Sequence, residues 1–188
     1  MKNIKLTLLS LSFLFIGCGT NIDDRNVDRE TKIYDLWEYM VPQHNYEVEY
    51  ESYKNGVKID YFFETTRVIN PSLVERESHD LYTRLIREEN AIQVKESNGA
   101  TINIQRFIKI GDTHIFNGSS NYDCNVENFF HSIKLKNIEF FNTIKINCQK
   151  EQIRKELYYA YNEGLVFISQ YDYQTKEEAV KIGERRVQ

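Results

Sequence analysis

The residue types that most often carry catalysis are present in this sequence, but their spacing does not predict an active site. No glycine-rich phosphate loop, Gly-x-Ser-x-Gly turn or zinc-protease motif occurs. The paired carboxylates Glu88-Glu89 and Glu177-Glu178 lie in charged runs, whereas acid–base catalysis needs a cleft that gives two carboxyl groups unequal environments. The histidines are scattered along the chain: His44, His79, His114 and His131. We therefore expect no enzymatic activity, no bound metal and no cofactor.

The N-terminus carries a stronger signal, which ends at Cys18. Lys2 and Lys5 precede an apolar run from Leu6 to Ile16. This run is too short for a membrane-spanning helix, which needs about 20 apolar residues. A positive start, a short apolar run and a cleavage point are typical of a secretory signal peptide, here expected over residues 1–17.

The end of this run adds a covalent modification. Phe15-Ile16-Gly17-Cys18 resembles the lipobox of bacterial lipoproteins. The resemblance implies that Cys18 receives a diacylglyceryl thioether, that the chain is cut before Cys18, and that the new amino group is acylated. Two or three acyl chains hold a protein stably on a membrane. Gly19, where an aspartate would favour the inner membrane, points to the periplasmic face of the outer membrane. The alternative is an ordinary secretory signal with an incidental cysteine.

Cys124 and Cys148 are the two cysteines that remain. Export implies an oxidising compartment, where an even pair of cysteines favours a disulfide. Such a bridge contributes roughly 3 kcal/mol of stability on the chain-entropy model. The alternatives are two free buried thiols, or a metal site that adds Asp123, His114 or His131. No short Cys-x-x-Cys or His-x-x-x-His spacing supports the metal site.

The composition favours one β-rich domain over residues 29–188. The 188-residue chain has a net charge of −4, which becomes more negative once the signal peptide is removed. A mildly acidic chain is a poor partner for nucleic acid, because phosphate contacts need clustered Lys and Arg side chains. The 13 tyrosines and 11 phenylalanines, with only 2 prolines, favour long strands. The length of this region allows a sizeable core.

A polar tether and a short helix are expected between the anchor and the strands. Residues 18–28 show no hydrophobic periodicity and predict a flexible tether beyond the lipidated cysteine. An apolar stripe that contains Trp37 then recurs at helical spacing, with Asp28 as a candidate cap, and it stops before Pro42. This pattern predicts a helix over about residues 30–40. The stripe either packs on the sheet as core or forms a lid or a partner-binding face.

Alternation of period two predicts antiparallel hairpins in the next part of the chain. Asn55-Gly56 is typical of a two-residue turn. That turn would set Tyr50 opposite Tyr61 and Val48 opposite Phe63, so that apolar side chains share one face of the hairpin.

A second turn, at Ser97-Asn98-Gly99, fits a three-residue loop. This loop length sets Val94 opposite Ile102 and requires Gly99 at positive φ. The segment 117–128 has no periodicity and is expected to be a loop that begins the disulfide-closed stretch.

The last hairpin differs from the others because both of its faces are apolar. Residues 157–161 lead through Asn162-Glu163-Gly164 into residues 165–168, and a three-residue loop would pair Tyr159 with Phe167. A hairpin of this kind is covered on both sides, or one face lines a pocket. The apolar pocket expected from this hairpin and the helix is lined by Trp37, Tyr159, Tyr161, Leu165 and Phe167.

The stretch Tyr158 to Val166 resembles a segment of uncharacterised bacterial envelope lipoproteins, and the broad pattern resembles the lipoprotein-localisation (LolA/LolB-like) half-barrels. The resemblance implies a mainly β (α+β) fold, with one curved antiparallel sheet or half-barrel of about 9–11 strands and one short N-terminal helix. We expect a lipid-anchored, non-catalytic envelope protein that binds an apolar ligand or lipid. The alternative is a structural or assembly lipoprotein that docks a membrane-protein partner.

Overall fold

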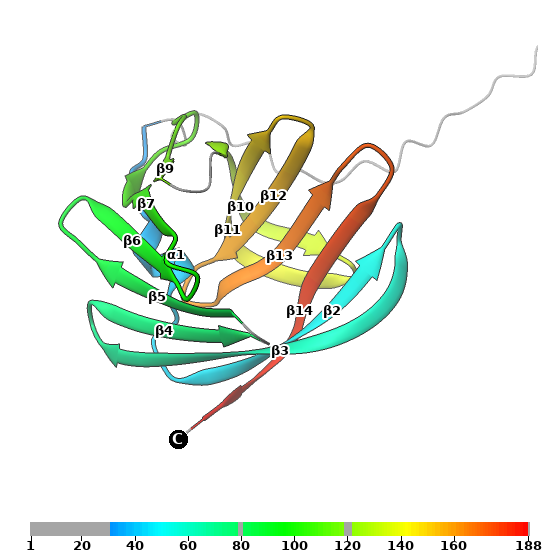
Figure 1. Cartoon of the computed structure of the whole chain (residues 1–188), viewed down its shortest axis with the longest axis horizontal. Coiled ribbons are helices and arrows are strands. Elements are labelled where there is room, and N and C mark those ends of the chain that lie inside the picture. Colours follow the sequence, from blue (N-terminus) through cyan, green and yellow to red (C-terminus); the bar gives the residue numbers. More distant parts are fainter. Residues whose placement is uncertain (1–30, 79–80, 119–121, 188) are drawn as a thin grey trace, which may run out of the picture.

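A curled β-sheet dominates the computed structural model, which describes residues 31–78, 81–118 and 122–187. Twelve antiparallel strands form one sheet that curves into a nearly closed barrel (Figure 1). The mainly β fold expected from the sequence is therefore confirmed. The predicted signal peptide, Cys18, the predicted tether and Asp28 lie outside the described residues, as does His79.

Consecutive strands pair along almost the whole sheet, and the C-terminal strand pairs with the strand that follows the helix. The order across the sheet is β10-β11-β12-β13-β14-β2-β3-β4-β5-β6-β7-β9. Its strands are β2 (Tyr46–Lys54), β3 (Val57–Asn70), β4 (Leu73–Ser78), β5 (Leu81–Arg87), β6 (Ala91–Glu96), β7 (Thr101–Gln105), β9 (Phe116–Gly118), β10 (Asp123–Leu135), β11 (Ile138–Lys150), β12 (Ile153–Ala160), β13 (Gly164–Tyr171) and β14 (Lys176–Arg186).

The barrel closes further than a half-barrel because the segment before β9 bonds to β10. The amide of Ile115 donates to the carbonyl oxygen of Cys124 at 3.1 Å, and the amide of Val126 donates to that of Asp112 at 2.9 Å. The sequence predicted a loop over 117–128, but part of this segment belongs to β9 and β10, and this raises the number of strands above the expected range.

The helix is shorter than predicted and lies inside the barrel. α1 covers only Leu36–Met40, because β1 (Tyr34–Asp35) pairs with β8 (Phe107–Ile108) instead of continuing the helix. The Asp35 side chain caps α1 by accepting from the Trp37 amide at 3.1 Å, and it is held by the Arg106 guanidinium. The helix ends before Pro42, as expected, since Val41 is extended.

Two apolar layers lie on opposite faces of the sheet. The interior layer surrounds α1, and it includes Trp37, Val74, Ile92 and Ile146. The exterior layer forms where the tip of the β10–β11 hairpin covers β12, β13 and β14, and its centre is Phe140. Burial of α1 in the first layer agrees with the expectation that its apolar stripe is core.

One bulge changes which side chains of the β2–β3 hairpin face the interior. The turn pairs Lys54 with Val57, as a two-residue loop requires, but the register shifts between Ser52 and Tyr53. Tyr50 therefore lies opposite Phe62, and the predicted pairing with Tyr61 is wrong. A bulge adds one residue to one strand, so every later side chain moves to the other face.

The shift changes which side chains of β3 are exposed on its outer face. Beyond the bulge, Tyr61 and Phe63 were expected to face inward but are 56% and 46% exposed. Val57, which keeps its predicted partner Lys54, and Ile59, which is the extra residue of the bulge, are also exposed, by 67% and 59%. The four form a row of large exposed apolar side chains on β3: Val57, Ile59, Tyr61 and Phe63. We call them the β3 stripe. Within the described residues, β4 pairs only with positions 65–70 of β3, so the edge of β3 beside the stripe has no strand partner.

Candidate functional site

The candidate site is a pocket at the end of the barrel where the β6–β7 turn lies. Its volume is about 400 Å³, within the range of small-molecule sites. We call it the mouth pocket. It is lined by Glu96, Asn98, Ala100, Ile102, Phe116, Tyr122, Cys124, Cys148, Lys155, Leu157 and Ile168.

Strand alternation explains why these side chains point inward. On β12, Lys155, Leu157 and Tyr159 share one face, with Leu157 and Tyr159 in the interior layer. The opposite wall comes from β7 and β9, where Ile102 and Phe116 pack against the same layer. The pocket is therefore apolar along its walls and becomes polar only at its rim.

The disulfide forms part of one wall. Cys124 and Cys148 lie directly opposite each other on β10 and β11 and are bonded, as the sequence predicted. Both are buried in the interior layer. On the other side of β11, Cys148 is the register partner of Lys155. The bridge therefore fixes the strand that positions Lys155.

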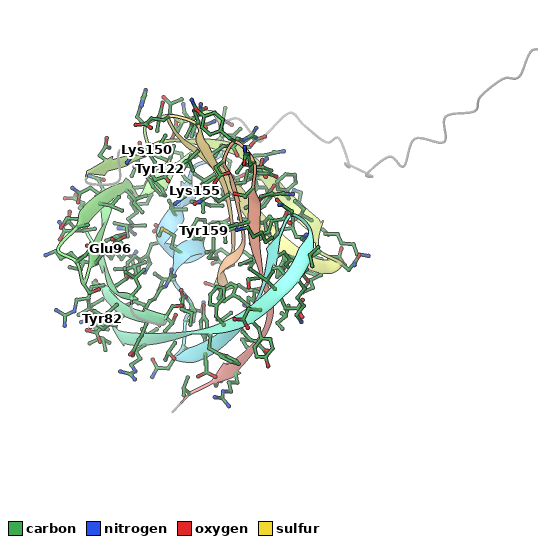
Figure 2. The ribbon with its side chains drawn as sticks, turned by 45° about the vertical axis from the view of Figure 1, so that its right-hand side comes forward. Tyr82, Glu96, Tyr122, Lys150, Lys155 and Tyr159 are labelled. Carbon is green, nitrogen blue, oxygen red and sulfur yellow. A yellow bond between two sulfur atoms is a disulfide. The ribbon has the colours of Figure 1, made fainter. Side chains whose placement is uncertain are left out.

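Two lysines and a tyrosine gather at the rim. The Lys155 Nζ lies 4.5 Å from the centroid of the Tyr122 ring, and the Lys150 Nζ lies 5.8 Å from it. Figure 2 shows these three side chains together at one side of the barrel, while Glu96 comes from a different part of the wall. Glu96 accepts a hydrogen bond from the Asn98 amide group at 3.0 Å.

A buried polar cluster contacts the end of α1. The Arg76 guanidinium donates to the carbonyl oxygen of Met40, the last residue of α1, and its Nε lies 3.8 Å from Glu64 Oε1. Burial disfavours the charge of Arg76, but Glu64 and the nearby tyrosines outweigh this, so that the pKa of Arg76 is raised. Burial raises the pKa of Tyr159 to about 12, so this hydroxyl stays neutral.

The five residues predicted to line an apolar pocket do not all meet. Tyr159 and Trp37 lie in the interior layer, and Leu165 packs against it. Tyr161 is 41% exposed, and together with Trp37 it lines a second pocket of about 360 Å³ at the opposite end of the barrel, beside the β3–β4 turn. Phe167 lies in the exterior layer.

The position of Phe167 is a correction with a clear cause. The chain turns through residues 161–163, with Ala160 opposite Gly164, so that Tyr159 pairs with Leu165 and not with Phe167. The register then shifts between Tyr158 and Tyr159, so that Tyr158 pairs with Phe167. The predicted loop over residues 162–164 was therefore displaced by one residue, and the bulge beyond it was not predicted. Phe167 consequently shares a face with Tyr158, away from α1.

Sequence reasoning missed the polar rim of the mouth pocket. Lys155 precedes Leu157 and Tyr159 at a spacing of two, so strand alternation could have placed it on the interior face. Lys150 and Tyr122 carry no such signal, because they reach Lys155 only through the pairing of β10, β11 and β12.

Across 31–78, 81–118 and 122–187, no three His, Cys, Asp or Glu side chains gather in a group that could hold a metal ion. His114 Nδ1 lies 2.9 Å from Asp123 Oδ1, on the exposed surface. The same described ranges contain no helix with the length and apolar character to cross a membrane.

The comparisons with known proteins found structural similarity alone. The chain matches no protein-family model, and no curated protein matches it. A crystal structure described as an exported protein with a YmcC-like fold, from Bacteroides fragilis NCTC 9343, has a TM-score of 0.49 and 11% identity, covering 79% of this chain and 99% of that chain. A protein described as a lipoprotein, from Parabacteroides distasonis ATCC 8503, has a TM-score of 0.37 and 10% identity, covering 78% and 98%. Since both scores are below 0.5, no conclusion about function or location follows from them.

Proposed function

We propose that this protein is exported, anchored by lipid on Cys18 at the periplasmic face of the outer membrane, and binds an apolar or lipid ligand without catalysing a reaction. The observation that carries the binding role is the mouth pocket of about 400 Å³. Its walls are the apolar side chains of Ile102, Phe116, Leu157 and Ile168. An apolar pocket of this size suits a single acyl chain.

The anchor is tested by labelling. Cells that express the full chain are fed an alkyne fatty acid, and the purified protein is assayed for the label. We expect the native chain to carry label and a Cys18→Ala variant to carry none, because the thioether and the new amino group both depend on Cys18. Label on the Cys18→Ala chain would refute lipidation at this residue.

The ligand is tested on the Cys18→Ala chain, purified without detergent. Native mass spectrometry is expected to detect a co-purified lipid, and calorimetry with fatty acids of 6 to 14 carbons is expected to show chain-length dependence. Each buried methylene contributes about 0.8 kcal/mol, so affinity should rise about fourfold per methylene until the pocket is full. No co-purified lipid, together with no binding of any fatty acid, would refute the ligand-binding role.

A pair of variants localises the binding. Ala100 lines the mouth pocket, so Ala100→Trp is expected to fill it and to abolish fatty-acid binding. Asn103 is exposed on the neighbouring strand, so Asn103→Trp adds the same side chain outside the pocket and should leave binding unchanged. Equal affinities for the two variants would place the ligand elsewhere.

A second candidate function is supported by the β3 stripe. An exposed apolar strand with an open edge is the kind of surface on which a protein partner adds a strand of its own. An assembly lipoprotein of this type would dock an extended segment of an envelope protein at positions 57–64. The fatty-acid experiment distinguishes the two functions, since a protein that only docks a partner takes up no acyl chain in the barrel.

A further inference from the structure

We infer that the ligand of the mouth pocket is an anionic amphiphile, whose carboxylate or phosphate head is bound by Lys155 and Lys150. This inference rests on the proposed function, because it adds the head group to a ligand whose apolar tail occupies the pocket. The starting observation is the position of Lys155, which lies on the same wall as Leu157 and lines the pocket itself. Its ammonium group thus stands where an apolar tail would end.

A second cation stands beside the first. The Tyr122 ring has the Lys155 Nζ at 4.5 Å and the Lys150 Nζ at 5.8 Å from its centroid. An aromatic ring attracts ammonium groups through its quadrupole, so Tyr122 holds two positive charges close together. All three side chains are half-buried. The fold therefore places the ammonium groups of Lys150 and Lys155 beside the same ring at the rim of the mouth pocket.

These two lysines differ from other half-buried or buried lysines of the barrel. Lys145 contacts the carboxylates of Glu127 and Glu156, and Lys181 contacts those of Glu163 and Glu184. Within the described ranges, neither Lys150 nor Lys155 has a carboxylate in ion-pair contact, and both ammonium groups lie beside the Tyr122 ring. The rim cations thus lack the acidic partner that the fold supplies elsewhere.

The acid nearest to this site in the pocket lining is Glu96. It comes from β6, on a different wall, and its carboxylate accepts from Asn98. The pocket lining holds one cation, Lys155, and one acid, Glu96, and Lys150 adds a second cation beside the same Tyr122 ring. An ammonium group is a compact donor of three hydrogen bonds, which suits the oxygens of a carboxylate or a phosphate monoester.

The arrangement of polar and apolar groups selects the ligand class. Below the lysines the pocket offers Ile102, Phe116, Leu157 and Ile168, which can bury a hydrocarbon chain but cannot satisfy a charge. A neutral apolar molecule would leave the lysines without a partner, and a cationic amphiphile would be repelled by them. A fatty carboxylate or an alkyl phosphate satisfies both parts of the site.

The test compares four probes with the same ten-carbon chain on the full Cys18→Ala protein: decanoate, decyl phosphate, decanol and decyltrimethylammonium. Affinities are measured by calorimetry. We expect decanoate or decyl phosphate to bind about tenfold or more tightly than decanol, as a charge-assisted hydrogen bond allows, and the cation to bind most weakly. The ratio between the two anions separates a carboxylate head from a phosphate head.

Lysine variants make the assignment specific. In the double variant Lys150→Gln and Lys155→Gln, both anions should lose about tenfold in affinity while decanol is unchanged. Lys95 is exposed on β6, so Lys95→Gln is the matched control and should change no affinity. If decanol binds as tightly as the anions, or if the double variant binds anions normally, the head-group inference is wrong while the apolar pocket stands. If no probe binds, the proposed ligand-binding function fails and the inference fails with it.

Discussion

Replacing Arg76 with methionine is expected to lower the free energy of unfolding by about 3–5 kcal/mol, because removing one partner of a buried ion pair leaves the other charge without compensation. The Arg76 and Glu64 side chains are only 13% and 20% exposed. Arg76 also donates to the carbonyl oxygen of Met40, so the variant loses the hydrogen bond at the end of α1. Urea unfolding followed by tyrosine and tryptophan fluorescence measures the effect.

Two further variants separate this explanation from a general loss of charge. Arg84 pairs with Glu75 at 3.1 Å, but its side chain is 54% exposed, so Arg84→Met should cost less than about 1 kcal/mol. The double variant Arg76→Met with Glu64→Gln should recover part of the loss, because it removes the uncompensated carboxylate. A similar loss for Arg76→Met and Arg84→Met would contradict the role of burial.

The Arg76 contacts explain how a five-residue helix keeps a fixed place inside the barrel. A helix this short has little stability of its own, so its position depends on tertiary contacts. Asp35 and Arg106 hold its first turn, and Arg76 holds its last carbonyl group. The helix thereby occupies the barrel interior, and its Trp37 lines the second pocket, at the end opposite the mouth pocket.

The strand register of the β6–β7 hairpin was predicted correctly, because the length of its turn alone determines which residues pair. In the β6–β7 hairpin, Val94 pairs with Ile102 and Gly99 has a φ of 88°, both as expected for a three-residue loop. The strands there contain no bulge, so counting from the turn gives the correct partners.

The same counting failed where a bulge follows the turn. In β2–β3 the turn pair Lys54–Val57 is correct, yet Tyr61 faces solvent because the register shifts at Ser52 and Tyr53. Periodicity could not reveal this, since the alternating apolar residues of β3 fit an inward face equally well. Counting from the turn without a bulge would also set Glu51 opposite Asp60, two like charges, whereas Glu51 lies opposite Tyr61.

The candidate site was predicted only in part for a related reason. Tyr159 lies in the interior layer and Leu165 packs against it, but the bulge between Tyr158 and Tyr159 places Phe167 on the outer face. The rim needed the pairing of three strands to bring Lys150 beside Tyr122. Pairing of this kind depends on tertiary structure, which a single sequence does not encode in its local pattern.

Loss of the Cys124–Cys148 bridge is expected to reduce the free energy of unfolding by roughly 3 kcal/mol, since the cross-link restricts the unfolded chain. The double variant Cys124→Ala and Cys148→Ala should therefore unfold at lower urea concentration than the native chain. A reductant should destabilise the native chain by a similar amount and leave the double variant unaffected. A native chain that is insensitive to reductant would show that the cysteines contribute as free thiols.

The same bridge should also affect ligand binding, because Cys148 is the register partner of Lys155. Without the cross-link, β10 and β11 keep their backbone hydrogen bonds, but the wall that positions Lys155 and Tyr122 is less restrained. The affinity for decanoate should then fall, while the affinity for decanol, which does not need the lysines, should fall less. Calorimetry on the double alanine variant under conditions where it remains folded measures both. An equal loss for the two probes would mean that the bridge supports only the apolar wall and does not position the lysines.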